Sequence, residues 1–308
     1  MNNLLPKISV IIRAYNPNEW IFEALESVFN QDYDGVIEVV LCYDRASRTG
    51  DVLEKLKAIE SSSNRVFKLI VHEHTSPTRA LFEHGFREFS GDYVTILDYD
   101  NLYPRDYICR IARKINGRDF VFTNPMLMDA SGHILGVRAH KDIPKRVSFE
   151  ALTAYNVCDA NGLILSRRAV EILLDHYERT LKKSKLTDLV HEDYFAALVL
   201  SMYFKPMYID EVYPLYRVHE SHQTWGEDPV SMSQTLIRDI ITLYMVFRAL
   251  EDKLSFRRKL ILFARMFRKM MTSLFYIAGA LLPILALPWG LIETLARYIR
   301  YAIKREKR

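Results

Sequence analysis

Residues 91–101 read GDYVTILDYDN, and within this stretch a short apolar run ends directly at a pair of aspartates. The run Tyr93–Leu97 is rich in β-branched and aromatic residues and too short for an ordinary helix, so it predicts a strand. Asp98-Tyr99-Asp100 follows without a spacer and predicts a turn. The stretch therefore predicts a buried strand with two carboxylates at its carboxyl end.

The sequence on either side of this stretch alternates between strand-like and helix-like segments. Short β-branched and apolar runs predict four further strands, at residues 8–12, 36–42, 67–71 and 120–123. Apolar residues at helical spacing predict helices between the first four strands, at residues 19–30, 51–60 and 77–89. This alternation predicts an α/β fold with a mostly parallel central sheet flanked by helices.

Polar residues follow directly after three of the predicted strands. Tyr15-Asn16 follows the first strand, Asp44 the second, and the acidic turn 98–100 the fourth along the chain. The carboxyl ends of parallel strands lie at one edge of a sheet, and ligands of such sheets bind beyond that edge. We therefore expect these residues to line one site, although they are far apart in the sequence.

The spacing of Asp98 and Asp100 is compatible with a metal site. A hard divalent cation such as Mg²⁺ or Mn²⁺ prefers oxygen ligands and keeps several waters, so one or two carboxylates plus substrate phosphates suit it. With this spacing, one aspartate can bind the cation and the other a ribose hydroxyl. Aspartates are also common in ordinary turns, so the motif alone leaves both interpretations open.

A second acidic pair, Glu192-Asp193, follows His191 and opens an apolar segment that predicts a helix. Carboxylates in the first turn of a helix are favoured by the helix dipole, so a structural role is one interpretation. His191 could orient Asp193 or lie at the surface. A transfer reaction that removes a proton from a hydroxyl needs a base, and a carboxylate is a suitable one.

Four motifs together resemble the nucleotide-diphospho-sugar transferase fold of family 2 glycosyltransferases, the GT-A fold. They read ISVIIRAYNP, EVVLCYDRAS, SGDYVTILDYDN and HEDYF, in this order within about residues 7–220. The resemblance implies a metal-dependent, inverting glycosyltransferase with Mg²⁺ or Mn²⁺ as cofactor. It also implies a nucleotide-diphosphate-sugar donor, typically a UDP-sugar.

The resemblance implies roles for individual residues at the donor site. Ala14-Tyr15-Asn16 would line the nucleotide site, with Tyr15 stacking on the base. Asp44 would accept a hydrogen bond from the base, and Asp98 would face the ribose. The residues expected to bind the nucleotide-sugar are Ala14, Tyr15, Asn16, Asp44, Arg79, Asp98 and Tyr99.

The resemblance also implies the metal ligands and the base. Asp100 would bind the metal, and His219, in the segment YRVHES, is similar to a later loop histidine that completes the metal site in some members. The Glu192-Asp193 pair corresponds to the catalytic motif of the family, which places the base on Asp193.

The chain departs from the family pattern at three places. Asp44 stands alone where the family often has two aspartates before a Gly-Ser turn, and Asn101 occupies the usual third acidic position. Residues 82–85 read FEHG where Arg-Asn often precedes a glycine. We expect Arg79 to supply the missing cation.

The C-terminal part is basic and apolar. Residues 251–308 contain 13 Lys and Arg against four Asp and Glu, and residues 273–292 carry no charge. Twenty such residues are long enough to span a bilayer, but Pro283 and Pro288 would kink a helix and both flanks are basic. A re-entrant hairpin or in-plane amphipathic helices fit best; a true span and a buried or oligomerisation element remain alternatives.

These patterns predict two regions and a location. We expect a GT-A transferase domain at residues 1–230 and a helical membrane-association region at residues 231–308. The basic region favours an anionic membrane surface over nucleic acid as partner, and it leaves a homo-oligomer open. The N-terminal MNNLLPK lacks an apolar core, so we expect no cleaved signal peptide and a peripheral or monotopic protein on the cytoplasmic face of a membrane.

The function expected from these features is transfer of a single sugar to a glycan or lipid-linked glycan acceptor in cell-surface polysaccharide synthesis. A processive polymerase needs several spanning helices, and the sequence offers one candidate stretch. A dehydrogenase is disfavoured because no GxGxxG motif follows a strand. The three cysteines lack the spacing of a zinc site. A non-catalytic scaffold of a membrane glycan-assembly complex is the remaining alternative.

Overall fold

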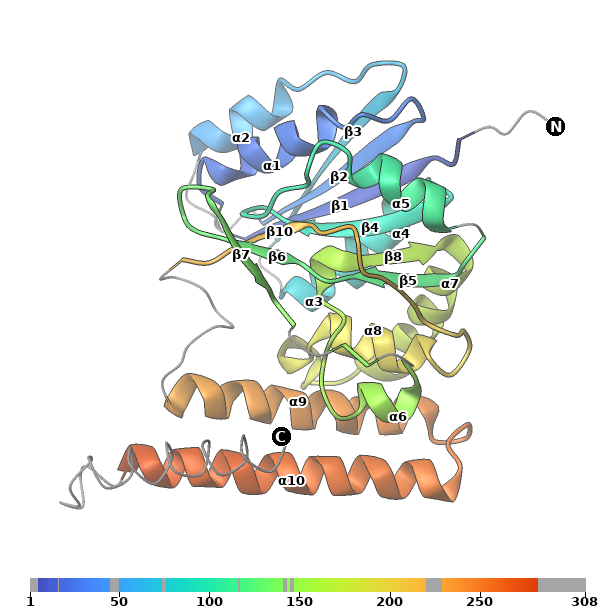
Figure 1. Ribbon diagram of the computed structural model, residues 1–308, viewed down its shortest axis with the longest axis vertical. Helices are drawn as coiled ribbons and strands as arrows, with labels where there is room; N and C mark the ends of the chain where they lie inside the picture. Colours follow the sequence, from blue (N-terminus) through green and yellow to red (C-terminus); the bar gives the residue numbers. More distant parts are fainter. Residues whose placement is uncertain are drawn as a thin grey trace.

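A seven-stranded sheet with helices on both faces forms the centre of the molecule (Figure 1). The computed structural model describes residues 5–15, 17–44, 50–73, 76–115, 117–140, 143–144, 147–219 and 229–281. In order across the sheet, the strands are β3 (Arg65–His72), β2 (Ile37–Asp44), β1 (Ile8–Ala14), β4 (Tyr93–Asp98), β8 (Leu163–Ser166), β5 (Phe120–Thr123) and β9 (Met207–Ile209).

The sheet is mixed but mostly parallel. Strand β8 runs antiparallel to both of its neighbours, β4 and β5, and the other pairs are parallel. The prediction of a mostly parallel α/β sheet is therefore confirmed, and the five predicted strands all form. Strands β8 and β9 were not predicted, because their short runs lie in an irregular part of the sequence.

The register of the sheet brings the polar residues after the strands to one edge. Arg13 on β1 lies opposite Cys42 on β2 and opposite Asp98 on β4. The carboxyl ends of β1, β2 and β4 therefore coincide. Since β1 and β2 are buried along their whole length, their apolar residues hold this register from both faces of the sheet.

Two apolar layers separate the sheet from its helices. One face packs against helices at the top of Figure 1, namely α1 (Trp20–Phe29), α2 (Gly50–Lys57) and α5 (Tyr107–Ile115). The other face packs against η1 (Ala80–Gly85), α4 (Phe86–Glu88), α6 (Phe149–Leu152), α7 (Arg167–His176), η3 (Tyr177–Leu181) and α8 (Glu192–Leu200). Helix α3 (Pro77–Arg79) directly precedes η1. The predicted helix at 77–89 thus forms as two short α-helical turns around the π-helix η1.

A second, smaller sheet lies beside the acidic turn. Its order is β10 (Leu215–Arg217), β6 (Met126–Met128) and β7 (Ile134–Arg138). Leu215 also pairs with Leu102, just beyond the acidic turn. The segment that ends in His219 is thereby held next to Asp100, as expected for the metal pair. The small sheet that holds it there was not predicted.

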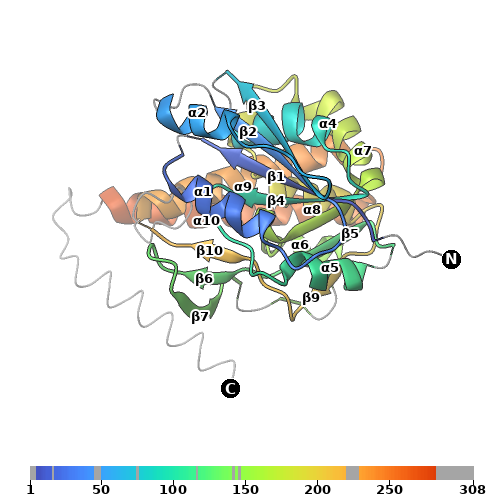
Figure 2. The ribbon, with the colours of Figure 1, turned by 90° about the horizontal axis from the view of Figure 1, so that it is seen from above.

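Two long helices at the C-terminal end stack below α8. Helix α9 (Pro229–Leu250) packs against α8, and α10 (Phe256–Leu281) runs back along α9 as the outermost layer (Figures 1 and 2). Leu243, Val246 and Leu250 of α9 belong to the same apolar core as α8. The helical character predicted for this region is confirmed as far as residue 281.

The uncharged stretch 273–292 is only partly described. Residues 273–281 form the last turns of α10, and residues 282–292 lie outside the described residues. Among the helices that the structure describes, none is both long and apolar enough to cross a bilayer. The domain boundary at residue 230 stays a prediction.

Candidate active site

A cavity of about 1040 Å³ lies beyond the carboxyl ends of β1, β2 and β4 and reaches the start of α8. Its volume is at the upper end of the usual range for small-molecule sites, which gives room for a large donor together with part of an acceptor. The donor residues expected from the sequence that line it are Ala14, Tyr15, Asp44, Asp98 and Tyr99. The expected metal and catalytic residues line it too: Asp100, Glu192, Asp193 and His219.

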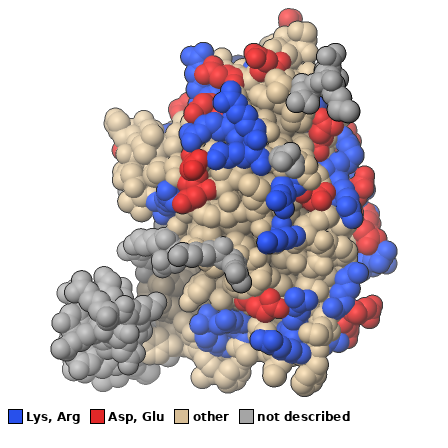
Figure 3. Space-filling view, turned by 45° about the vertical axis from the view of Figure 1, so that its right-hand side comes forward, with Lys and Arg blue, Asp and Glu red and all other residues tan. Residues whose placement is uncertain are grey.

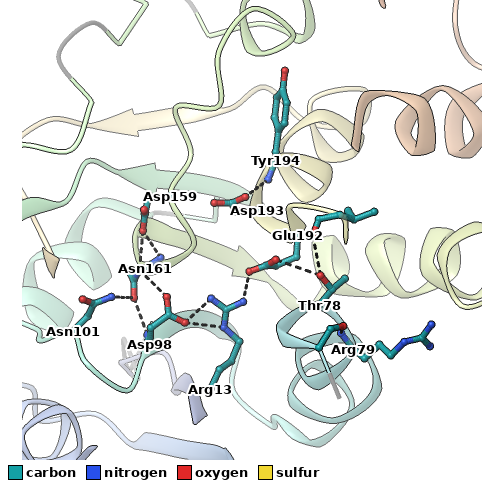
Figure 4. Close-up of polar contacts among 12 residues, drawn as sticks. Arg13, Thr78, Arg79, Asp98, Asn101, Asp159, Asn161, Glu192, Asp193 and Tyr194 are labelled. Carbon is teal, nitrogen blue, oxygen red and sulfur yellow. Dashed lines mark hydrogen bonds and ion pairs between the residues drawn. The ribbon is translucent and has the colours of Figure 1, made fainter. Parts of the chain in front are cut away.

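Arg13 joins the two acidic motifs of the cavity (Figure 4). Its Nε lies 2.9 Å from Oδ1 of Asp98, and its Nη1 donates a hydrogen bond to Glu192. The guanidinium is buried, with 9% of its side chain exposed. Burial alone would lower the pKa of Arg13, but the charges of Asp98 and Glu192 raise it, so the group stays protonated. One cation therefore neutralises carboxylates from both motifs.

The Glu192 carboxylate is held on both of its oxygens. Oε1 accepts the bond from Arg13, and Oε2 lies 3.4 Å from the hydroxyl of Thr78 at the start of α3. Burial raises the pKa of Glu192, but the charge of Arg13 and the hydrogen bonds to the carboxylate together outweigh burial, so the pKa is lowered overall. Glu192 is therefore an ionised, fixed group, which suits a positioning role better than proton transfer.

Asn161 fixes the other side of the acidic turn. Its side-chain Oδ1 accepts a hydrogen bond from the Asp98 backbone at 2.8 Å, and its Nδ2 donates to Asp98 Oδ2 at 3.2 Å. Asp159 caps the short helix η2 (Ala160–Gly162) that carries Asn161. The next residue, Gly162, packs so closely on Thr123 that a Cβ would lie 2.4 Å from its carbonyl oxygen. This close packing positions η2 against the sheet.

Asp100 and His219 form the pair expected to bind a metal. His219 Nε2 lies 3.1 Å from Asp100 Oδ2, and the ring of Trp20 packs 4.8 Å from the imidazole. Burial and the nearby charge of Asp98 raise the pKa of Asp100. A buried carboxylate next to another carboxylate is the kind of group that a cation stabilises.

The ligand atoms of Asp100 and His219 limit which metal would suit this pair. Within the described residues, no group of three His, Cys, Asp or Glu side chains gathers as a closed metal site. One carboxylate and one imidazole do not make a zinc centre. They do fit a Mg²⁺ or Mn²⁺ ion that takes its remaining ligands from water and substrate phosphates.

Asp193 lies beside Glu192 but has a different environment. Its Oδ1 accepts hydrogen bonds from the Tyr194 backbone at 2.6 Å and from Asn156 Nδ2 at 3.1 Å. Burial raises the pKa of Asp193 well above its ordinary value, and the charges of Glu192 and Asp159 raise it further. A cavity carboxylate with a raised pKa is suited to accept a proton.

Arg79 is an expected donor residue that does not reach the cavity. Arg79 donates to Asp188 at 2.8 Å and to Glu83 at 3.2 Å, does not line the cavity, and points away from Arg13 and Asp98 in Figure 4. The guanidinium of Arg79, which we expected at the nucleotide, therefore pairs with Asp188 instead. Asn16 lies outside the described residues, and its role stays a prediction.

Sequence reasoning missed three residues that organise the site: Arg13, Asp159 and Asn161. An arginine inside a β-branched strand is itself a signal, because a buried guanidinium needs carboxylate partners. Asp159 and Asn161 carry no comparable signal, because their segment has neither helical nor strand periodicity.

The chain is similar in sequence to known glycosyltransferases. Residues 9–161 match the profile of a family described as Glycosyl transferase family 2. The chain is 22% identical over 267 residues to an N-acetylglucosaminyltransferase from Bradyrhizobium diazoefficiens; the match covers 82% of the chain and 53% of that relative. The chain thus spans about half the length of this relative.

Two solved structures share the fold. The mannosyltransferase PcManGT from Pyrobaculum calidifontis, in complex with GDP-Man and Mn²⁺, has a TM-score of 0.58 and 17% identity, covering 98% of this chain and 81% of its own. Residues 1–349 of S. aureus TarS, in complex with UDP-GlcNAc, have a TM-score of 0.50 and 13% identity, covering 87% and 81%. At these identities the likeness shows the fold.

Arg13 is expected to contribute strongly to stability. In Arg13→Met, the carboxylates of Asp98 and Glu192 would lose their shared counter-charge, and breaking a buried pair in this way costs about 3 kcal/mol. Urea unfolding followed by circular dichroism measures the loss. Adding Glu192→Gln to Arg13→Met should restore part of it, because one of the two uncompensated carboxylates is then neutral. A double variant no more stable than Arg13→Met would contradict this account.

Proposed function

Because the chain belongs to glycosyl transferase family 2, we propose that it is an inverting, metal-dependent transferase. It moves a single sugar from a nucleotide-diphosphate sugar to a glycan or lipid-linked glycan, as a step of cell-surface polysaccharide synthesis. The observation that carries this proposal is the meeting of Asp98-Tyr99-Asp100 with Glu192-Asp193 on one cavity, joined by Arg13.

The donor is expected at the sheet edge. Ala14 and Tyr15 line the cavity at the end of β1, and the buried Asp44 lines it at the end of β2, so they can receive a nucleoside. Tyr15 is 44% exposed, which leaves its ring accessible for stacking on a base. We favour a UDP-sugar; the two structures of similar fold hold UDP-GlcNAc and GDP-Man, which supports a nucleotide-diphosphate sugar in general.

Asp100 and His219 would hold the divalent cation. When bound, Mg²⁺ or Mn²⁺ would offset the negative charge that grows on the diphosphate leaving group. The Mn²⁺ in the complex of the mannosyltransferase PcManGT supports a divalent metal in this fold. Asp98, engaged by Arg13 and Asn161, is better placed to orient a donor hydroxyl than to ligate metal.

Asp193 is the proposed base. The acceptor hydroxyl gives its proton to this carboxylate while its oxygen bonds to the anomeric carbon. The bond between that carbon and the phosphate oxygen breaks, and its electron pair leaves with the nucleoside diphosphate. Because the acceptor enters opposite the leaving group, the anomeric configuration inverts. The hydrogen bonds to Oδ1 hold the carboxylate in place, and the raised pKa makes it a better proton acceptor.

Asp193→Asn should abolish transfer without abolishing nucleotide binding. Loss of a general base lowers kcat by about 10²–10⁴-fold, whereas Asp44 and Tyr15 remain in place. Nucleotide release from a panel of UDP- and GDP-sugars measures turnover, and calorimetry with UDP and Mn²⁺ measures binding. Asp188→Asn is the matched control, because Asp188 pairs with Arg79 outside the cavity. Undiminished turnover in Asp193→Asn would remove this residue from the mechanism.

Asp100→Asn should weaken the response to metal. The Mn²⁺ concentration for half-maximal turnover should rise by about 10-fold or more, since a ligating carboxylate becomes a neutral amide and loss of even an outer-shell partner of a ligand costs at least about this much. A matched control exists on the surface: Asp129 also lies beside a histidine, 3.2 Å from His133 Nδ1, and does not line the cavity. Asp129→Asn should leave the metal titration unchanged. An equal metal requirement in Asp100→Asn and in the wild type would exclude Asp100 as a ligand.

The second part of the proposal concerns the membrane. Large apolar side chains of α10 that recur every three or four residues are between 43% and 82% exposed: Phe256, Leu260, Phe263, Phe267, Met270 and Leu274. The buried residues Leu262, Lys269 and Ser273 lie on a different face of the helix, toward the body of the protein. Such a stripe on an outermost helix suits the interface of a bilayer.

The charges next to this stripe favour an anionic surface. Arg257 and Arg268 are exposed on α10. Figure 3 shows Lys and Arg side chains beside uncharged surface along the lower edge, where α10 lies in Figure 1. The basic residues of the segment 297–308 would add to this attraction. We therefore propose that the protein is a peripheral or monotopic enzyme at the cytoplasmic face of a membrane.

Replacing Phe263, Phe267 and Leu274 of α10 by Ser should lower co-sedimentation with phosphatidylglycerol vesicles by about tenfold or more, because each buried side chain contributes about 1.5–3 kcal/mol. The matched control replaces Ile134, Leu135 and Val137 of β7, which are equally exposed but lie on another element. This control should bind vesicles like the wild type. Equal recovery of the α10 variant and the wild type would refute attachment through this face.

A further inference from the structure

Part of the cavity wall comes from the two C-terminal helices. Thr235, Arg238 and Asp239 of α9 and Lys269 of α10 line it, together with residues of the proposed mechanism. None of these four residues has a role in donor binding, metal binding or proton transfer as described above. They lie on the part of the wall built by the elements that follow Asp193 in the chain.

A buried ion pair forms the centre of this wall. Lys269 Nζ lies 2.6 Å from Asp239 Oδ2, and the two side chains are 9% and 14% exposed. Asp239 Oδ1 lies 3.8 Å from Nε2 of His191, the residue directly before the Glu192-Asp193 pair. Among the described residues, His191 Nε2 has no hydrogen-bond partner. The wall therefore presents hydrogen-bond donors and hydrogen-bond acceptors side by side. His191, at its edge, lies two residues before the proposed base in the chain.

An exposed aromatic ring belongs to the same cavity. Tyr155 lines it and is 63% exposed, although tyrosine is usually covered in a folded protein. The guanidinium of Arg268, on α10, lies 5.9 Å from the centre of this ring. The neighbouring Asn156 donates the hydrogen bond to Asp193 Oδ1. Tyr155 is thus one residue away from a direct contact of the base.

We propose that Tyr155, Asp239 and Lys269 form the acceptor subsite and that it takes a neutral sugar ring. The apolar face of the ring packs on Tyr155, and neighbouring hydroxyls donate to Asp239 and accept from Lys269. Sugar hydroxyls both donate and accept, which matches a paired carboxylate and ammonium. A phosphate group suits this ion pair less well than a sugar ring does, because Asp239 already neutralises Lys269. The inference rests on the proposed function and names the acceptor class for the same site.

The test uses the full-length protein with Mn²⁺, UDP-GlcNAc, UDP-glucose and GDP-mannose as donors. The acceptors are p-nitrophenyl glycosides of glucose, galactose, mannose and N-acetylglucosamine, each compared with the corresponding sugar 6-phosphate. Nucleotide release without acceptor gives hydrolysis, and glycoside product gives transfer. In Tyr155→Ala, Asp239→Asn and Lys269→Met, the acceptor KM should rise at least tenfold and the ratio of transfer to hydrolysis should fall accordingly.

Two matched controls lie outside the cavity. Tyr244 is an exposed tyrosine of α9. Glu150 of α6 pairs with Arg258 of α10 at 2.8 Å, so that this pair also joins α10 to the body. Tyr244→Ala and Glu150→Gln should keep the wild-type acceptor KM. Calorimetry with UDP shows whether each variant is folded, and Tyr155→Ala, at an exposed residue, tests the subsite even where a variant of the buried pair fails to fold.

Each outcome decides one of the two proposals. A wild-type protein that releases no nucleotide from any donor overturns the proposed function. Wild-type turnover with an unchanged acceptor KM in Tyr155→Ala, or with the same rise in the controls, overturns the subsite alone. Turnover that no glycoside increases, or that the sugar phosphates increase more, overturns the neutral sugar ring as the acceptor.

Discussion

The guanidinium of Arg13 is shared by two carboxylates that lie nearly a hundred residues apart in the chain. Asp98 ends strand β4, and Glu192 begins helix α8, yet both form ion pairs with Arg13 at the end of β1. Three acidic residues of the cavity, Asp98, Glu192 and Asp193, lie close together, and their mutual repulsion would oppose folding without a cation among them. The sheet edge and α8 therefore meet in this geometry because Arg13 lies between them.

The shared guanidinium of Arg13 gives the carboxylates of the two acidic motifs different roles, structural for some and reactive for others. Asp98 is bound by Arg13 and by the neutral side chain of Asn161. Glu192 is bound by Arg13 and by the neutral side chain of Thr78. Asp100 and Asp193 are the remaining members of the two motifs, and burial raises the pKa of both. In the proposed function, the first holds the cation and the second takes the proton. Each acidic motif thus has one residue that fixes the geometry and one that acts on substrate.

The parts of the fold that sequence reasoning predicted are those with local signals. The buried run of β4 followed by two aspartates, and the acidic pair that opens α8, depend on neighbouring residues alone. The partner of Arg79 could not be predicted, because Asp188 reaches it from 109 residues away across the fold. For the same reason, the placement of Asn161 under the acidic turn and the insertion of antiparallel β8 follow from tertiary packing. The contribution of Lys269 to the cavity likewise depends on how α10 packs on α9.

In the proposed function, Asp193 directs an acceptor hydroxyl to the face of the sugar opposite the diphosphate. The anomeric configuration of the product tests this role most directly. Proton NMR during the first minutes of turnover, with a donor that the enzyme accepts, reports the coupling constant of the new anomeric proton. The configuration of the product is expected to be inverted relative to the donor. A first-formed product with retained configuration would contradict it.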